Sequence, residues 1–223
     1  MNFLINLKKP SGYFALIAEI KLKSPSEGFL GNESQVVEIT GQYQEAGADA
    51  LSVVTEKKLF AGNIKLIKTV KKACQLPVLC KDFVTEGRQL KAIAEAGADA
   101  VLLLSRILND LQLEILKQTA QKLNLLPIVE ADNFNDLNRI KNRNFPVVAV
   151  NARNLDDLTV DRDRACRMLR LIPEATFKLA FSGVRNRQDV RDYLKSGARG
   201  VLVGTALMKS ADRINLIREL KKL

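Results

Sequence analysis

The chain of 223 residues contains no histidine and no tryptophan, and it has only three cysteines and three tyrosines. Without histidine, imidazole acid–base catalysis and histidine-ligated metals are excluded, so any proton transfer falls to Lys, Glu, Asp, Tyr or Cys. The cysteines, Cys74, Cys80 and Cys166, are odd in number and follow no metal-binding spacing. We expect each to be a small core residue of a protein in the reducing cytoplasm.

Charge is unbalanced, with 35 Lys and Arg against 25 Asp and Glu and a net charge of +10. The basic residues are scattered and are not interleaved with aromatic residues, so we expect attraction for anionic metabolites and no binding of nucleic acid. No stretch approaches the roughly 20 apolar residues of a membrane span. The first 20 residues are interrupted by Lys8, Lys9, Pro10 and Gly12, which does not fit a signal peptide. We therefore expect no association with a membrane.

One phrase recurs along the chain. It reads "EAGADALSVV" from Glu45, "EAGADAVLLL" from Glu95 and "KSGARGVLVG" from Lys195. In each copy a small residue and a glycine end a helix, the glycine acting as a left-handed cap, and a short apolar strand follows. The first two copies are 50 residues apart, a distance that fits two strand–helix units.

Short apolar runs supply the remaining units, and their continuous hydrophobicity is typical of strands buried on both faces. Eight runs are predicted as strands, over residues 16–21, 50–55, 77–81, 100–104, 126–130, 146–151, 177–182 and 200–204. Amphipathic stretches with helix-start signals lie between them, for example after Ser34, Asn63 and Thr85.

Eight alternations without a linker predict an α/β fold, a single (β/α)₈ TIM-barrel domain over residues 1–223. A doubly wound open sheet is the alternative. Such a sheet usually has a glycine-rich dinucleotide turn after its first strand, and "KLKSPSEGFLG" is not such a turn.

The carboxyl ends of the predicted strands carry polar, charged or glycine residues. In the first strand, Glu19 and Lys21 are two residues apart and therefore point to the same side. Two charges facing an interior would be costly unless they served a site. In a barrel these strand ends converge on one rim, where we expect Glu19, Lys21, Lys81, Glu130, Asn151, Arg153, Ser182, Gly183, Gly204 and Thr205.

Glycines follow the seventh and eighth predicted strands, in "FSGVRN" and "VGTALMKS". Barrels often hold a phosphate at this position against backbone N–H groups and a helix N-terminus. Glycine lets the backbone approach an anion closely, and Thr205 adds a hydroxyl at the expected start of the last helix. We predict a phosphate site beside the Glu19–Lys21 pair, because strand eight neighbours strand one in a closed barrel.

Six segments, in order and from about Phe14 to the C-terminus, resemble the signatures of the indole-3-glycerol phosphate synthase family. They are "LIAEIKLKSPSEGFLG", "PVLCKDFV", "PIVEADNFNDL", "VVAVNARNLDDLTVD", "SGVRNRQDV" and "VLVGTALM". The resemblance implies a (β/α)₈ lyase of tryptophan biosynthesis that acts without metal or organic cofactor. It would convert 1-(o-carboxyphenylamino)-1-deoxyribulose 5-phosphate, a phosphorylated carboxylate, to indole-3-glycerol phosphate, releasing CO₂ and water. We expect a cytoplasmic monomer.

Residue roles carried over from the resemblance fall into two groups. Lys81 would be the general acid of ring closure and Glu130 the acid/base partner in dehydration, and Glu19, Lys21 and Asn151 would complete the catalytic group. Lys21 would also lie near the substrate carboxylate. The substrate-binding residues would be Arg153 with Asn151 at the anthranilate end, Ser24, Ser182, Gly183, Gly204 and Thr205 at the phosphate, and Phe83 and Phe181.

The chain departs from the family pattern in two places. Only about 15 residues precede the first strand, so we expect a shortened N-terminal extension, without the helix that helps to close the pocket in the family. The family also has "ESG" where this chain has Phe181-Ser182-Gly183. The presence of Phe181 has two interpretations: neutral sequence drift at a core position, or a changed or lost activity. A non-catalytic relative that binds a phosphorylated ligand therefore stays open as the alternative function, and a barrel isomerase acting on another phosphosugar is a weaker one.

Overall fold

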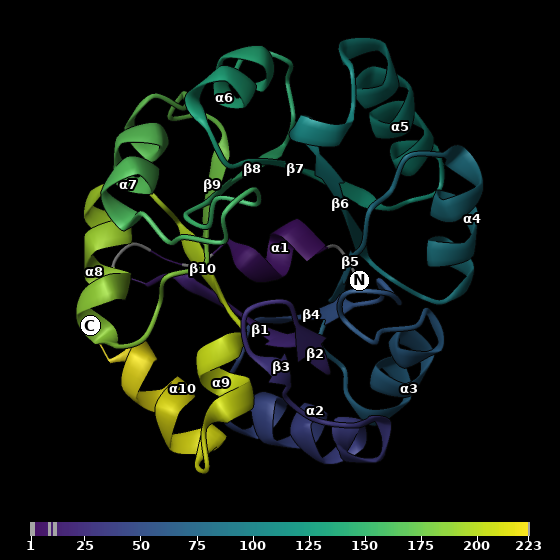
Figure 1. Cartoon of the computed structure of the whole chain (residues 1–223), viewed down its shortest axis with the longest axis vertical. Coiled ribbons are helices and arrows are strands. Elements are labelled where there is room, and N and C mark those ends of the chain that lie inside the picture. Colours follow the sequence, from purple (N-terminus) through teal and green to yellow (C-terminus); the bar gives the residue numbers. More distant parts are fainter. Residues whose placement is uncertain (1–2, 9, 11–12, 223) are drawn as a thin grey trace.

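The computed structural model describes residues 3–8, 10 and 13–222. In this part of the chain, eight parallel strands close into a barrel in the order β1-β10-β9-β8-β7-β6-β5-β4, and β1 pairs with both β4 and β10 (Figure 1). The strands are β1 (Ala15–Ile20), β4 (Ala50–Val54), β5 (Val78–Lys81), β6 (Ala100–Leu104), β7 (Leu126–Ala131), β8 (Val147–Asn151), β9 (Phe177–Phe181) and β10 (Gly200–Val203). The predicted (β/α)₈ barrel is confirmed, and every predicted strand end agrees to within one residue.

Helices surround the barrel, and all but the last of the longer ones connect successive strands (Figure 1). They are α2 (Val36–Glu45), α3 (Lys65–Ala73), α4 (Gly87–Glu95), α5 (Asp110–Lys122), α6 (Phe134–Ile140), α7 (Arg162–Arg170), α8 (Arg187–Lys195) and α10 (Arg213–Lys221). Shorter elements are α1 (Phe3–Leu7), the hairpin strands β2 (Lys23–Ser24) and β3 (Gly28–Phe29), the 3₁₀ helices Glu33–Gln35 and Ser105–Ile107, and α9 (Thr205–Lys209). None of the helices in the described part of the chain is long and apolar enough to cross a membrane.

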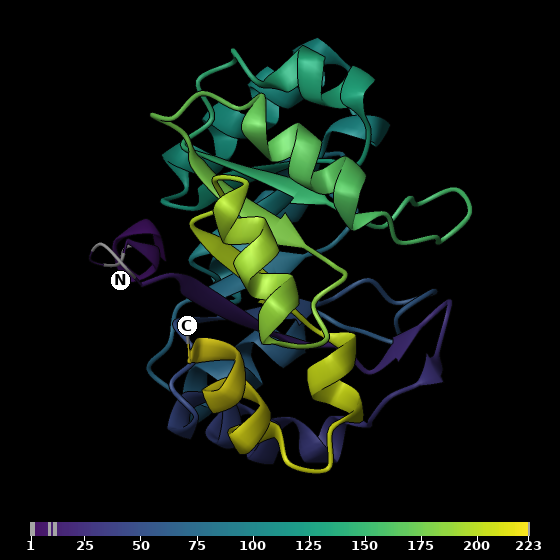
Figure 2. The same ribbon diagram turned by 90° about the vertical axis from the view of Figure 1, so that its left-hand side faces the viewer.

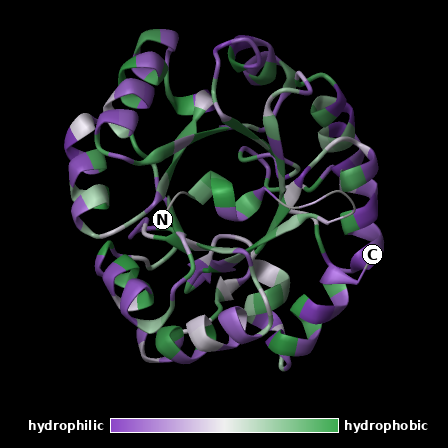
Figure 3. Cartoon of the chain, turned by 180° about the vertical axis from the view of Figure 1, so that it is seen from behind, coloured by the Kyte–Doolittle hydropathy of each residue, from purple (hydrophilic) through white to green (hydrophobic). Residues whose placement is uncertain are grey.

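Two layers of apolar side chains explain why the strands are hydrophobic on both faces. In β1, Ala15 and Ile17 belong to the cluster that fills the barrel, whereas Leu16 and Ala18 belong to the cluster between strands and helices. This alternation follows from the period of two in a β-strand. The helices turn their polar faces outward around this core (Figure 3). Cys74, Cys80 and Cys166 are unpaired and buried, as predicted.

Helix α1 closes the floor of the barrel. Phe3 and Leu7 of α1 are buried in the cluster that fills its interior. Figure 2 shows α1 at one end of the barrel and the β2–β3 hairpin at the opposite end. The hairpin follows the carboxyl end of β1, so the described residues that precede β1 lie at the floor and do not cover the mouth.

Helix starts were predicted less accurately than strands. Asn63 accepts the backbone N–H of Lys65, as expected at a helix start. Ser34 does not start its helix: it lies inside a 3₁₀ turn that begins after Asn32, and its hydroxyl donates to the Asn32 side chain. Thr85 was also predicted wrongly, since Glu86 is the residue that precedes α4. Where several polar residues adjoin, the path of the loop decides which one caps the helix.

We predict that Leu7→Ala lowers the free energy of unfolding by about 2–5 kcal/mol, because it removes a fully buried side chain from the barrel floor. Urea denaturation of the whole chain measures this loss. Ile5→Ala on the same helix is the matched control, since Ile5 is 66% exposed and its replacement should change stability by less than about 0.5 kcal/mol. Equal effects of the two substitutions would show that α1 does not pack into the floor.

Candidate active site

Strand alternation places Glu19 and Lys21 inside the mouth of the barrel. Ala15 and Ile17 face the interior, and Glu19 and Lys21 are the next two positions of that series. The same rule brings Lys81 inward after Leu79 on β5, and Glu130 inward after Ile128 on β7. Charged side chains from three strands therefore meet above the apolar filling of the barrel.

The Glu19 carboxylate joins two lysines. Its Oε1 lies 3.1 Å from Nζ of Lys21 and its Oε2 lies 3.0 Å from Nζ of Lys81, while Glu19 itself is only 2% exposed. A side chain at Gly204 would collide with this carboxylate, because a Cβ there would lie 2.3 Å from Oε1. The packing of Glu19 therefore requires glycine at position 204. From the sequence we predict this glycine for a different reason, the close approach of the backbone to a phosphate.

The ion pairs decide the protonation of this cluster. Burial alone would raise the pKa of Glu19, but the ammonium groups of Lys81 and Lys21 outweigh it and lower that pKa to about 2. Burial disfavours the charged form of Lys81, yet the carboxylates of Glu19 and Glu130 outweigh it and raise the pKa of Lys81. Lys81 is therefore a protonated donor at neutral pH.

Glu130 has the opposite character to Glu19. It is 3% exposed, and burial raises its pKa, a shift that Lys81 and a hydrogen bond from Asn151 only partly offset. Asn151 donates to Oε1 at 3.1 Å, and Oε2 is buried without a hydrogen-bond partner among the described residues. A buried carboxyl with a raised pKa and a free oxygen is suited to carrying a proton in a reaction.

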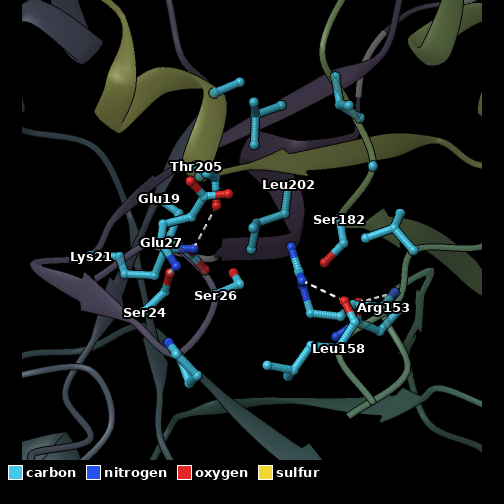
Figure 4. A pocket seen from close by; sticks show the side chains of 18 of the residues that line it. Glu19, Lys21, Ser24, Ser26, Glu27, Arg153, Leu158, Ser182, Leu202 and Thr205 are labelled. Atoms are coloured by element: carbon cyan, nitrogen blue, oxygen red, sulfur yellow. Dashed lines mark hydrogen bonds and ion pairs between the residues drawn. The ribbon is translucent and has the colours of Figure 1, made fainter. Parts of the chain in front are cut away.

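A cavity of about 440 Å³ opens above the cluster (Figure 4). Glu19, Lys21 and Thr205 lie on one side of it, and Arg153 and Ser182 on the other. Lys21 donates to the Thr205 hydroxyl at 3.1 Å, which links the charged cluster to the predicted phosphate residues. Of the predicted site residues, the cavity is lined by Glu19, Lys21, Ser24, Lys81, Asn151, Arg153, Ser182, Gly183, Gly204 and Thr205.

Tight turns shape the part of the wall where we predicted phosphate. Ser182 and Gly183 both adopt left-handed backbone conformations, with φ of 67° and 78°. Thr205 is the first residue of α9, a short helix that precedes α10. The prediction that Thr205 starts the last helix is therefore wrong, because α10 is the last helix. Ser24 is buried, and its hydroxyl accepts the N–H of Glu27 within the β2–β3 hairpin.

A smaller cavity of about 70 Å³ adjoins the larger one, and both are lined by Lys81 and Asn151. Glu130 and Phe83 line only the smaller cavity, together with Leu102 and Leu104. The larger cavity has charged side chains along its walls and the smaller one has mainly apolar walls, and Lys81 lies where they meet. A ligand with one anionic end and one aromatic end could occupy both cavities, with its central atoms beside the Lys81 ammonium group.

Phe181 is placed differently from the expectation. Its side chain faces the barrel axis on β9, is fully buried and lines neither of the two cavities. The ammonium group of Lys81 lies above the ring, 5.7 Å from its centroid, a cation–π contact. Phe181 therefore supports Lys81 from below and is not part of the wall of either cavity.

Several lining residues were missed by the sequence prediction. Lys209 and Glu27 both line the larger cavity and form an ion pair of 2.7 Å, although they are 182 residues apart. Arg185 lies within the quoted "SGVRN" and could have been chosen. Leu155 and Leu158 come from the loop after β8, within the quoted segment "VVAVNARNLDDLTVD", and could also have been chosen. The described residues contain no group of three or more Cys, Asp and Glu side chains that could hold a metal ion.

The lowered pKa of Glu19 makes a pH-dependent contribution to stability. The carboxylate stabilises the fold fully above pH 4.5 and loses this effect as the pH falls toward 2. The shift corresponds to roughly 3 kcal/mol. We predict that the difference in unfolding free energy between the parent and Glu19→Gln narrows by about this amount from pH 5 to pH 2. Urea denaturation across this range measures it, and a constant difference would contradict the ion-pair account.

Comparison with known proteins agrees with this geometry. The family model "Indole-3-glycerol phosphate synthase" matches residues 1–220. The indole-3-glycerol phosphate synthase of Leuconostoc mesenteroides is 37% identical over 209 residues, which cover 93% of this chain and 80% of the relative. That of Sulfurisphaera tokodaii is 38% identical over 200 residues, covering 90% and 80% of the two chains.

Solved structures support the fold. The crystal structure of 3-hexulose-6-phosphate synthase superposes with a TM-score of 0.73 at 19% sequence identity, over 93% of this chain and 98% of that one. At this identity the likeness concerns the barrel alone. The match of the family model along the chain, and the relatives above 30% identity, are decisive: the chain belongs to the indole-3-glycerol phosphate synthase family.

Proposed function

We propose that this chain catalyses the ring closure of 1-(o-carboxyphenylamino)-1-deoxyribulose 5-phosphate to indole-3-glycerol phosphate, with loss of CO₂ and water. One observation carries the proposal. Lys81, whose pKa is raised, and Glu130, a buried carboxyl with a raised pKa and a free oxygen, line the same small cavity. A protonated donor and a proton-carrying carboxyl are what this dehydrating ring closure requires in a chain without histidine.

The substrate has a phosphate at one end and a carboxylated aromatic ring at the other, which fits the two adjoining cavities. We infer that the phosphate binds in the larger cavity at Ser182, Gly183, Gly204 and Thr205, with Ser24 in the same wall. The aromatic ring would enter the smaller cavity beside Phe83, Leu102 and Leu104, near Asn151, and Arg153 would face the ligand from the wall of the larger cavity. The ketone carbon between the two ends would then lie at Lys81.

Ring closure begins with attack of the aromatic carbon that bears the carboxylate on the ketone carbon. The ketone oxygen gains negative charge as the new C–C bond forms, and Lys81 donates a proton to it. Release of CO₂ leaves its electron pair in the ring and restores aromaticity. Glu19 keeps Lys81 charged and in place for this step, at 3.0 Å.

Dehydration completes the indole. Glu130 donates a proton to the departing hydroxyl, and the carboxylate that remains takes a proton from the methylene carbon beside the ring nitrogen, so that the C–C double bond of the indole forms as water leaves. The raised pKa of Glu130 favours its protonated form and so supports this role. The hydrogen bond from Asn151 to Oε1 holds the carboxyl in position and leaves Oε2 for the substrate.

The donor, the carboxyl group and the predicted phosphate residues of the proposed reaction all line the two cavities of this chain. We propose that the protein acts as a cytoplasmic monomer on this phosphorylated carboxylate. The net charge of +10 favours association with such an anionic substrate.

Fluorescence assay of indoleglycerol phosphate formation tests the function directly. We expect turnover by the parent chain, and a decrease in kcat of about 10²- to 10⁴-fold in Lys81→Met, because methionine keeps the aliphatic stem and removes the donor. The thermal midpoint serves as the control for folding. Lys81→Ala should lose as much activity as Lys81→Met.

Two outcomes would contradict the proposal. Absence of turnover in fresh, folded parent protein would remove the activity, and tight binding of a substrate analogue without turnover would then favour a non-catalytic relative. Near-parental turnover in Lys81→Met would show that the general acid is another residue.

Phe181 offers a second test, since it stands where the family sequence has glutamate. We predict that Phe181→Glu raises turnover, because it adds a carboxylate beneath the Lys81 ammonium, where the ring now lies 5.7 Å away. The thermal midpoint should fall, because a charge replaces a fully buried aromatic ring. Measurement of kcat/KM and thermal midpoint on both proteins checks the two effects together.

Phe181→Leu is the matched control for this substitution. It removes the ring without adding charge, so it should lower stability without raising turnover. Equal or lower turnover in folded Phe181→Glu would show that Phe181 does not limit the activity of this chain.

A further inference from the structure

The turn between β9 and α8 is held in an unusual conformation. Ser182 is a non-glycine residue with φ of 67°, and Gly183 follows with φ of 78°. A left-handed non-glycine residue costs conformational energy, and it persists only where neighbouring groups hold it. Ser182 and Gly183 both line the larger cavity.

Tyr193 of α8 holds this turn from behind. Its side chain is fully buried, and its hydroxyl donates to the backbone carbonyl of Ser182 at 2.9 Å. The same hydroxyl leaves no room at the next residue, since a Cβ on Gly183 would lie 3.0 Å from it and 2.8 Å from Cγ of Arg162. Burial raises the pKa of Tyr193, so the hydroxyl keeps its proton at neutral pH.

Asp189 fixes the other half of the turn. Its buried carboxylate accepts the N–H of Arg185 at 2.7 Å and that of Asn186 at 3.2 Å, and it also pairs with Arg162. The N–H groups of Gly183 and Val184, by contrast, have no acceptor among the described residues. Two consecutive N–H groups on a cavity wall, in a turn held rigid from outside, are donors suited to an anion.

We propose that Tyr193 is a positioning residue of the phosphate subsite: its hydroxyl holds the Ser182–Gly183 turn in the conformation that presents the N–H groups of Gly183 and Val184 to the substrate phosphate. This inference rests on the proposed function, because it assigns the anion at this wall to the phosphate of the substrate. Tyr193 does not itself contact the ligand, since it is buried behind the turn.

Tyr193→Phe tests the inference, because it removes the hydroxyl and keeps the ring. Isothermal calorimetry with inorganic phosphate should show about 5- to 10-fold weaker binding than in the parent, as expected for the loss of one hydrogen bond. The KM for the substrate should rise by a similar factor, with kcat changed by less than about twofold. Unchanged phosphate affinity in folded Tyr193→Phe would overturn the inference.

Ser105→Ala is the matched control. Ser105 is also buried, and its hydroxyl donates to a strand-end carbonyl, that of Glu130, at 2.6 Å. Its loss should leave phosphate affinity unchanged. An equal loss of affinity in both variants would attribute the effect to general loosening of the barrel and overturn the inference. If Tyr193→Phe fails to fold, Gly183→Ala takes its place, because its Cβ would lie 3.0 Å from the Tyr193 hydroxyl and so disturbs the same contact, and parental phosphate affinity in that variant would likewise overturn the inference.

The calorimetric measurement separates this inference from the proposed function. A parent that binds phosphate without turning over substrate, together with weaker binding in Tyr193→Phe, supports the positioning role and contradicts the activity. Normal turnover with equal phosphate affinity in both proteins supports the activity and contradicts the positioning role. A parent that binds no phosphate overturns the inference.

Discussion

The site depends on one buried carboxylate that pairs with two ammonium groups. Glu19 lies between Lys21 and Lys81 at 3.1 and 3.0 Å, and neither a single lysine nor an unpaired glutamate would be stable at that depth. Its influence extends outward: Gly204 must lack a side chain because the carboxylate occupies that space, and Lys21 is directed to the Thr205 hydroxyl. The charged cluster and the phosphate wall are therefore parts of one packed unit.

Barrel geometry makes this unit possible. The alternation that buries Ala15, Ile17 and Leu79 inside the barrel brings the next inward positions, Glu19 and Lys81, to the mouth. The apolar interior below the cluster raises the cost of unpaired charge, so each ionisable group keeps the protonation state that its partners set. Glu19 stays ionised beside two lysines, whereas Glu130, with a single amide donor, has a raised pKa. Two carboxyl groups in one site thus acquire different chemical properties.

The sequence was sufficient to predict the strands and which strand-end residues line the cavity, because apolar runs, helix-ending glycines and strand-end charges are local signals. Contacts that depend on tertiary structure were not predictable. The Glu27–Lys209 pair joins the first hairpin to the end of α9, and Tyr193 reaches the Ser182 carbonyl from a neighbouring helix. Phe181 was expected on the cavity wall, but its place in the inward series of β9 puts it beneath Lys81. The sequence shows that Phe181 departs from the family pattern, but it does not show that the Phe181 ring contacts the Lys81 ammonium group.

The central claim is that Glu19 sets the charge of Lys81. The most direct test is an NMR titration of the Lys81 ammonium group in isotopically labelled parent protein and in Glu19→Gln. The account predicts a pKa above the ordinary 10.5 in the parent and a lower value in the variant, where burial is no longer offset by the nearest carboxylate. The same Lys81 pKa in both proteins, or a value below 10.5 in the parent, would contradict it.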